Sequence, residues 1–192
     1  RADAGGLGDA APAHTSSTSF RYDPMDPTPS VGGRVLARSA GQRDNRALEA
    51  RDDVRTFTTA ALRTPVELRG GAKVRLCVEP DNPYSDVFVR LCDVEPNGRS
   101  VNITDRLVRL DPAPGEEPTT GQRVVETTLP DTAHRFRAGH RLRLQISGGA
   151  HPRYARNLGT GEPLGQADHG VPTTHRIGHG SAAPSSITLP TA

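Results

Sequence analysis

From Val54 onward the sequence consists of short runs of β-branched and aliphatic residues, separated by clusters of Gly, Pro, Asn and Asp. No helical period persists through these runs, and several of them alternate apolar with polar residues. Runs of this length and punctuation favour β-strands joined by turns. The sequence also contains 20 glycines and 17 prolines, so turns and loops must take up much of its length. We therefore expect an all-β domain.

Eight of these runs are predicted to be strands: RTFTT (55–59), PVELRG (65–70), AKVRLCVE (72–79), DVFVRLCDVE (86–95), VNITDRLVRL (101–110), QRVVETTL (122–129), HRLRLQIS (140–147) and SITLP (186–190). Alternation gives each strand an inner and an outer face. The residues expected to face inward are Val74, Leu76 and Val78 in the third run and Leu142, Leu144 and Ile146 in the seventh. The seventh run is interpreted as a half-buried edge whose outward face carries Arg141, Arg143 and Gln145. Strands of this kind predict a jelly-roll β-sandwich.

The connections between these runs carry their own signals. Asn97-Gly98, which lies between two predicted strands, indicates a tight type I′ turn. Segment 44–53 predicts at most one turn of helix with Asp44 as its N-cap, because its apolar residues form only a partial stripe. The stretch 151–172 has no period, and we expect a long ordered loop there.

The two cysteines, Cys77 and Cys92, lie in neighbouring predicted strands. A regular hairpin would place them nearly opposite each other, so a disulfide is one interpretation. Free buried thiols are the preferred interpretation, because two cysteines are too few for the disulfide framework of a secreted protein. We accordingly expect a cytoplasmic location.

Residues 1–33 are interpreted as a linker and residues 34–192 as one domain. The first residues, RADAGGLGDAAPAHTSSTSF, are small and polar and lack the apolar core of a signal peptide. Pro24, Pro27 and Pro29 follow closely, a spacing that excludes both a helix and a regular strand ladder. We expect this segment to join the domain to the rest of a longer protein.

Charge and hydropathy narrow the choice of partners. The net charge is only +2, from 24 basic and 22 acidic side chains that are spread along the chain rather than gathered into blocks. This distribution predicts no nucleic-acid partner. No stretch approaches the roughly 18 apolar residues that are needed to cross a bilayer, so we expect a soluble chain with no membrane partner.

Patterns that carry catalytic or cofactor chemistry are missing from the sequence. Ser147 and Ser181 adjoin glycines but lack the Gly-x-Ser-x-Gly pattern of a hydrolase nucleophile, and we interpret both as turn residues. His175 and His179 lie in a strand-like segment, where their side chains would be about 13 Å apart, too far to share a metal. No glycine-rich phosphate loop is present. We therefore assign no catalytic, cofactor-binding or metal-binding residue.

Five segments, taken in order, carry a resemblance to a known family: YDPMDPTPSVGG (22–33), GQRDNRALEARDDVRTFTTAALRTPVELRG (41–70), VFVRLCDVEPNGRSVNITD (87–105), LPDTAHRFRAGHRLRLQISGGAHPRYARNLGTGEP (129–163) and THRIGHGSAAPSSITLP (174–190). They resemble the C-terminal domain of the X-Pro dipeptidyl-peptidase and cocaine-esterase-like (CocE/NonD) serine hydrolases. The resemblance implies a jelly-roll, galactose-binding-like fold. One departure is Gly180 after His179, where the family often has Asp.

The same resemblance implies a function. The Ser-His-Asp triad of such hydrolases would belong to an α/β-hydrolase domain preceding Arg1, so no member of it is assigned here. This chain would be a non-catalytic domain that packs on the α/β-hydrolase domain of the same polypeptide and helps to shape the substrate cleft. The substrate, whether an X-Pro peptide, an ester or an acyl amide, is left open. Arg43, Asp44 and Arg46 are predicted to form the domain contact, because Arg binds carboxylates in a fixed geometry. An exposed charged loop is the alternative interpretation of these residues.

Two other functions are kept as alternatives. A freestanding carbohydrate-binding module would share the scaffold. The sequence, however, has no Trp and only three Tyr (Tyr22, Tyr84 and Tyr154) from which to build a stacking platform. The second alternative is an oligomerisation module that uses the outward face of the run 140–147.

Overall fold

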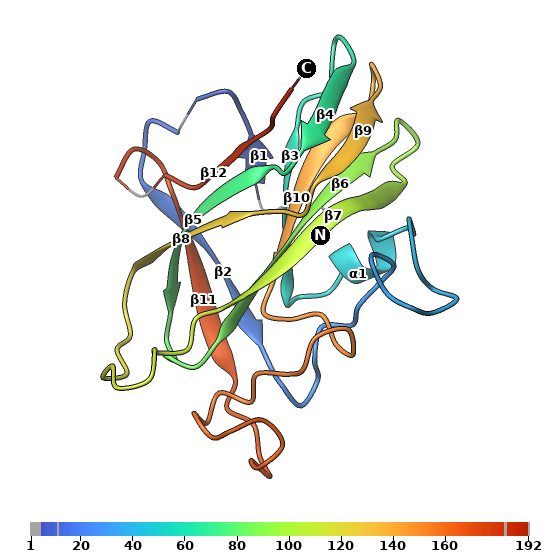
Figure 1. Cartoon of the computed structure of the whole chain (residues 1–192). Helices are drawn as coiled ribbons and strands as arrows, with labels where there is room; N and C mark the ends of the chain where they lie inside the picture. The colour runs from blue at the N-terminus through green and yellow to red at the C-terminus, as the bar shows by residue number, and fades with distance from the viewer. Residues whose placement is uncertain (1–4, 11, 183, 192) are drawn as a thin grey trace.

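The computed structural model describes residues 5–10, 12–182 and 184–191 and is almost entirely β (Figure 1). The strands are β1 (Gly5–Leu7), β2 (Ser16–Tyr22), β3 (Val54–Thr59), β4 (Val66–Gly70), β5 (Lys73–Pro80), β6 (Asp86–Val94), β7 (Ser100–Arg109), β8 (Arg123–Thr128), β9 (Thr132–Phe136), β10 (Arg141–Ser147), β11 (Thr173–His179) and β12 (Ser186–Thr188). A single helical turn, α1 (Arg46–Glu49), precedes β3. The predicted all-β, jelly-roll-like class is confirmed.

Two five-stranded sheets form the sandwich. The first has the order β1-β3-β10-β6-β7. In the second, β12, β5, β11 and β2 follow one another, and β8 pairs with β5. A separate two-stranded ribbon of β4 and β9 lies at one end of the sandwich, above β6 and β7 in Figure 1.

The apolar core lies between the two sheets and uses the predicted inward faces. Leu76 and Val78 of β5 are 1% and 0% exposed, and Leu144 and Ile146 of β10 are 3% and 1% exposed. Each such side chain contributes roughly 1.5–3 kcal/mol through burial. The alternation of apolar and polar residues therefore identified the inner face of both strands correctly.

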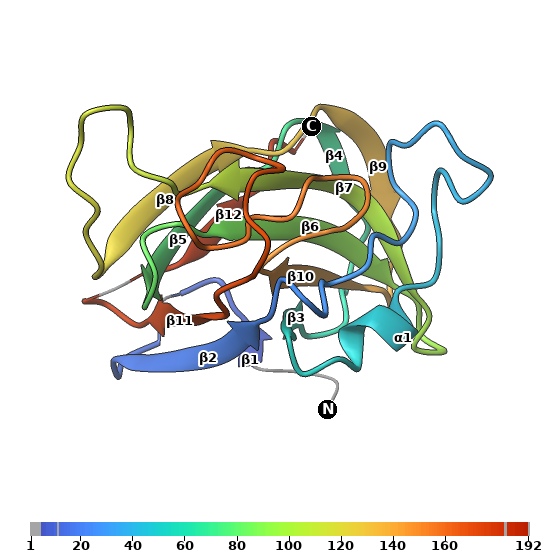
Figure 2. The same ribbon diagram turned by 90° about the horizontal axis from the view of Figure 1, so that it is seen from below.

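The outer face of the first sheet is also buried, which the sequence analysis did not expect. Arg143 and Gln145 of β10, predicted to face solvent, are 8% and 0% exposed. The prediction of an edge strand was wrong as well, because β10 lies between β3 and β6. The chain around α1 and the loop after β10 lie over this face (Figure 2). Outward-facing polar side chains on a covered sheet must find partners within the protein.

The turn between β6 and β7 differs from its prediction. Gly98 has a φ of +87°, but no residue other than glycine has a positive φ among those described, so Asn97 cannot be part of a type I′ turn. The Gly98 N–H donates to the Glu95 carbonyl instead, with Pro96 and Asn97 between them. Proline at the second position fixes a φ that suits an ordinary type I turn.

Several strands were not predicted from the sequence. β1 and β2 lie inside the segment 1–33 that was interpreted as a linker, and β9 was also missed. In β2 only Phe20 and Tyr22 are buried, while most of its residues are exposed and polar. The pairing of β2 with β11 holds this strand in the sheet. Residues 151–172, predicted to form a long loop, contain no helix or named strand in the structure.

The cysteines follow the preferred interpretation. Cys77 in β5 and Cys92 in β6 belong to different sheets, so they are not opposite each other, and both are free and buried. Burial raises the pKa of the Cys92 thiol to about 12. Neither cysteine is therefore placed for ready reaction.

Candidate domain interface

The segment that contains the predicted contact residues is fixed to the outer face of the first sheet. Asn45, the N-cap of α1, is completely buried, and its backbone N–H donates to the Ser100 carbonyl at 2.7 Å. Its side-chain oxygen accepts a 2.6 Å hydrogen bond from Arg90. Asp44 is therefore not the N-cap, although its carboxylate accepts a hydrogen bond from the Arg46 backbone N–H.

Two ion networks lie beneath this segment. In the first, Glu49 of α1 accepts hydrogen bonds from Arg143 and from the Ser100 hydroxyl, both at 2.6 Å. In the second, Asp105 of β7 binds Arg90 and Arg153, whose side chains are 0% and 11% exposed. Buried charges are tolerated only when they are paired in this way. The networks therefore hold together three parts of the protein: residues 43–49, which form a cap over this face, the first sheet, and the loop after β10.

The three predicted contact residues do not form one cluster. Arg46 and Asp44 make a bidentate ion pair, with the closest atoms 2.6 Å apart and side chains that are 58% and 33% exposed. The hydrogen bond from Arg46 is the main reason that the pKa of Asp44 falls below its usual value. Arg43 points away from this pair, because its guanidinium donates to the backbone carbonyls of Arg38 and Gln42. Two of the three residues therefore remain candidates for direct contact.

A polar groove of about 390 Å³ lies beside this segment, and Gln42 lines one side of it. On its floor, the two carboxylate oxygens of Asp93 lie 2.8 Å from His140 Nδ1 and 2.9 Å from His134 Nε2. Burial alone would raise the pKa of Asp93, but the hydrogen bonds with His134 and His140 outweigh it, so the pKa is lowered. The groove is therefore lined by a carboxylate and two imidazoles that bind one another.

Sequence reasoning missed this groove for a clear reason. His134 and His140 are 41 and 47 positions from Asp93, and they come from β9 and from the turn before β10. No local spacing pattern joins such residues. The pairing of β10 with β6 brings His140 beside Asp93, and the position of the β4–β9 ribbon brings His134 there.

Residues considered for catalysis or metal binding take structural positions. The Ser147 hydroxyl is buried and donates to the Gly149 carbonyl. His175 lies in the core and His179 contacts Thr18, so the two do not converge. Over residues 5–10, 12–182 and 184–191, no group of three or more His, Cys, Asp and Glu side chains is arranged to hold a metal. Within the same ranges, no helix is long and apolar enough to span a bilayer.

The fold first defines a class of protein, the jelly-roll-like β-sandwich. In this protein the first sheet is covered on both of its faces over much of its area. Comparison with known proteins then gives the family. Residues 2–188 match the X-Pro dipeptidyl-peptidase C-terminal non-catalytic domain, and the chain belongs to this family. The resemblance found in the sequence is therefore confirmed.

Relatives of known structure or function are larger than this chain. Cocaine esterase from Rhodococcus sp. (strain MB1 Bresler) is 33% identical over 187 residues, which are 91% of this chain and 32% of the esterase. An α-amino acid ester hydrolase shares the fold with a TM-score of 0.78 at 24% identity, over 96% of this chain and 33% of its own. An aminopeptidase from a marine sediment Thaumarchaeota archaeon does so with a TM-score of 0.83 at 22% identity, over 98% and 35%. The chain thus spans about a third of the length of the proteins it matches.

Proposed function

We propose that this chain is the non-catalytic part of a larger serine hydrolase, in which it packs on the α/β-hydrolase domain and helps to shape the substrate cleft. The observation that carries the proposal is the match of nearly the whole chain to about a third of each relative. The relatives include an esterase, an ester hydrolase and an aminopeptidase, so the parent protein is proposed to hydrolyse an ester or an amide. Free buried cysteines accord with a cytoplasmic location.

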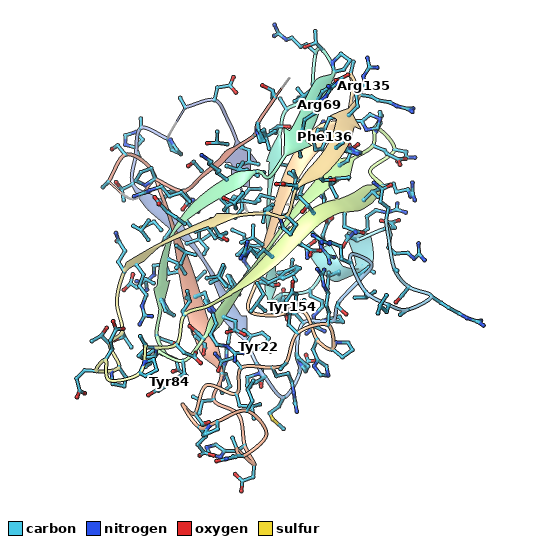
Figure 3. The ribbon with its side chains drawn as sticks, viewed as in Figure 1. Tyr22, Arg69, Tyr84, Arg135, Phe136 and Tyr154 are labelled. Atoms are coloured by element: carbon cyan, nitrogen blue, oxygen red, sulfur yellow. The ribbon has the colours of Figure 1, made fainter. Side chains whose placement is uncertain are left out.

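The two alternative functions have less to support them. Tyr22 is 4% exposed, Tyr84 lies against Gly161, and Tyr154 packs against Phe88, so the tyrosines labelled in Figure 3 offer no shared exposed platform for a sugar. Of the three residues proposed for an oligomerisation surface on β10, Arg143 and Gln145 are buried and only Arg141 is exposed.

The first test is chemical labelling with a fluorophosphonate probe. The folded chain should show no labelled serine. It should also show no turnover of an X-Pro chromogenic amide or of short acyl esters. The intact polypeptide should be labelled once, at a serine outside residues 1–192. Stoichiometric labelling of Ser147, Ser181 or any other serine of this chain would contradict the proposed non-catalytic role.

The second test concerns the predicted contact. In the intact enzyme, replacing Arg46 with Ala should lower the thermal midpoint by about 2–4 °C, because the contact with the hydrolase domain is weakened. The matched control is Arg69→Ala, which removes another exposed Arg, one that is paired with Glu67. Arg69 lies on the β4–β9 ribbon, away from α1 (Figure 3). Equal midpoints for Arg46→Ala, the control and the unaltered enzyme would remove Arg46 from the interface.

A further inference from the structure

Residues 34–40 form a loop that projects from the cap over the first sheet. Its neck is closed by two backbone hydrogen bonds between Gly33 and Gly41, at 2.8 and 2.9 Å. Figure 2 shows it as the blue loop that stands out at the right, beside α1. The loop therefore begins and ends at one point on the surface of the domain.

The neck is seated on the buried ion network. Gly33 has a φ of +82°, and a Cβ at this position would lie 2.6 Å from Arg153 Nη1 and 3.1 Å from Asp105 Oδ2. Only glycine combines this backbone conformation with such a close approach. The Asn102 side chain, which comes from β7, donates to the Gly41 carbonyl at 3.1 Å. The base of the loop is thus held in one position.

Arg43 holds in place the second half of the loop, which leads back to the neck. Its guanidinium donates to the Arg38 carbonyl at 2.8 Å, and its backbone N–H donates to Asn102 Oδ1 at 2.8 Å. Within the loop, the Ala40 N–H donates to the Ala37 carbonyl. Arg43 is therefore a positioning residue for the loop rather than a direct contact.

At the outer end of this supported loop, an apolar side chain lies entirely in water. Leu36 is 109% exposed, the largest exposure among the large hydrophobic residues given for the described chain. Arg34 and Arg38 flank it and are exposed, and segment 34–43 contains three Arg and no acidic residue. No side-chain ion pair of Arg34 or Arg38 occurs within the described residues. A single exposed leucine is common on proteins, but here it is held outward by a fixed neck and a hydrogen-bonded arm.

We propose that loop 34–40 is a docking element. Leu36 enters an apolar pocket on the α/β-hydrolase domain, and Arg34 and Arg38 pair with carboxylates at the rim of that pocket. The inference rests on the proposed packing of this chain on a hydrolase domain. That occupant is chosen because about two thirds of each relative lies outside the matched region, and because the loop is continuous with the proposed contact at Asp44 and Arg46.

The test is cysteine accessibility in the intact polypeptide. Leu36→Cys, Arg46→Cys and Leu164→Cys are made separately, and each is treated with a maleimide under native conditions and in urea, with labelling followed peptide by peptide. Leu164 is 61% exposed in another loop and serves as the matched reference. Cys77 and Cys92 are buried and give the slow limit. Since Leu36 is not covered by any of the residues that the structure describes, protection of a cysteine there is attributed to the rest of the polypeptide.

We expect the Leu36→Cys thiol to react about tenfold or more slowly in the native protein than in urea, because contact with the hydrolase domain removes it from solvent. A native rate equal to the urea rate, with Arg46→Cys still protected, would overturn the docking loop and leave the proposed packing intact. Unprotected cysteines at both positions would overturn the docking loop and also remove the contact proposed at Arg46.

Discussion

Replacing Asp105 with Ala is expected to lower the free energy of unfolding by about 3–5 kcal/mol, the range found when one partner of a buried ion pair is removed. Asp105 is the shared acceptor of Arg90 and Arg153, and its own side chain is 2% exposed. Without it, two guanidinium groups would lie beneath the cap with no carboxylate to neutralise them. The measurement is urea unfolding at neutral pH.

The matched control for this prediction is Glu79→Ala. Glu79 is also a strand carboxylate paired with an Arg, but its side chain is 44% exposed and that of Arg176 is 56% exposed. Solvent screens such a pair, so the expected loss is about 0–1 kcal/mol. Asp105→Asn, which keeps the shape of the side chain, should fall between the two. Equal losses for Asp105→Ala and Glu79→Ala would show that the buried network does not stabilise the cap.

The sequence predicts strands best where apolar and polar residues alternate over a covered inner face. β5 and β10 fulfil this condition, and their inward residues were identified correctly. β2 does not, since SSTSFRY buries only Phe20 and Tyr22 and owes its place to pairing with β11. Alternation of apolar and polar residues identifies which residues face a core. It does not identify strands that are held mainly by backbone hydrogen bonds at a sheet edge.

The polar layer under the cap explains why the site was predicted less well than the fold. Arg143 and Gln145 look like solvent-facing residues of an ordinary amphipathic strand, yet the chain around α1 covers them. Their partners are remote in sequence: Glu49 is 94 positions from Arg143. A covered polar face and an exposed one have the same local pattern, so only the path of the chain distinguishes them.

A second buried group should make the stability of the protein depend on pH. His175 of β11 is 0% exposed, its ring stacks on Phe20 with centroids 4.8 Å apart, and neither ring nitrogen has a hydrogen-bond partner. Burial lowers the pKa of His175 from 6.5 to about 4. The backbone groups of Asp86 and Thr173 and the charge of Asp81 favour the protonated ring and raise the pKa of His175, but burial outweighs them. The imidazole is therefore neutral in the folded protein at neutral pH.

The sign of the effect follows from this lowered pKa. Between pH 6.5 and about 4, the unfolded chain binds a proton at His175 and the folded chain does not. Stability is therefore lost as the pH falls through this window, by roughly 3 kcal/mol once the pH is below the folded pKa. His175→Phe retains an aromatic ring beside Phe20 and removes the titrating group. We expect the variant to lose less stability than the unaltered protein between pH 7 and pH 4.

The measurement is the free energy of unfolding by urea at several pH values, and the quantity compared is its change from pH 7 to pH 4. Comparing changes removes the cost of fitting a larger ring into the core, because that cost is the same at each pH. His14→Phe is the matched control, since His14 is exposed and the substitution should leave the pH dependence unaltered. Parallel curves for His175→Phe and the unaltered protein would mean that His175 is protonated in the folded state as readily as in the unfolded state, which would contradict the lowered pKa of this buried imidazole.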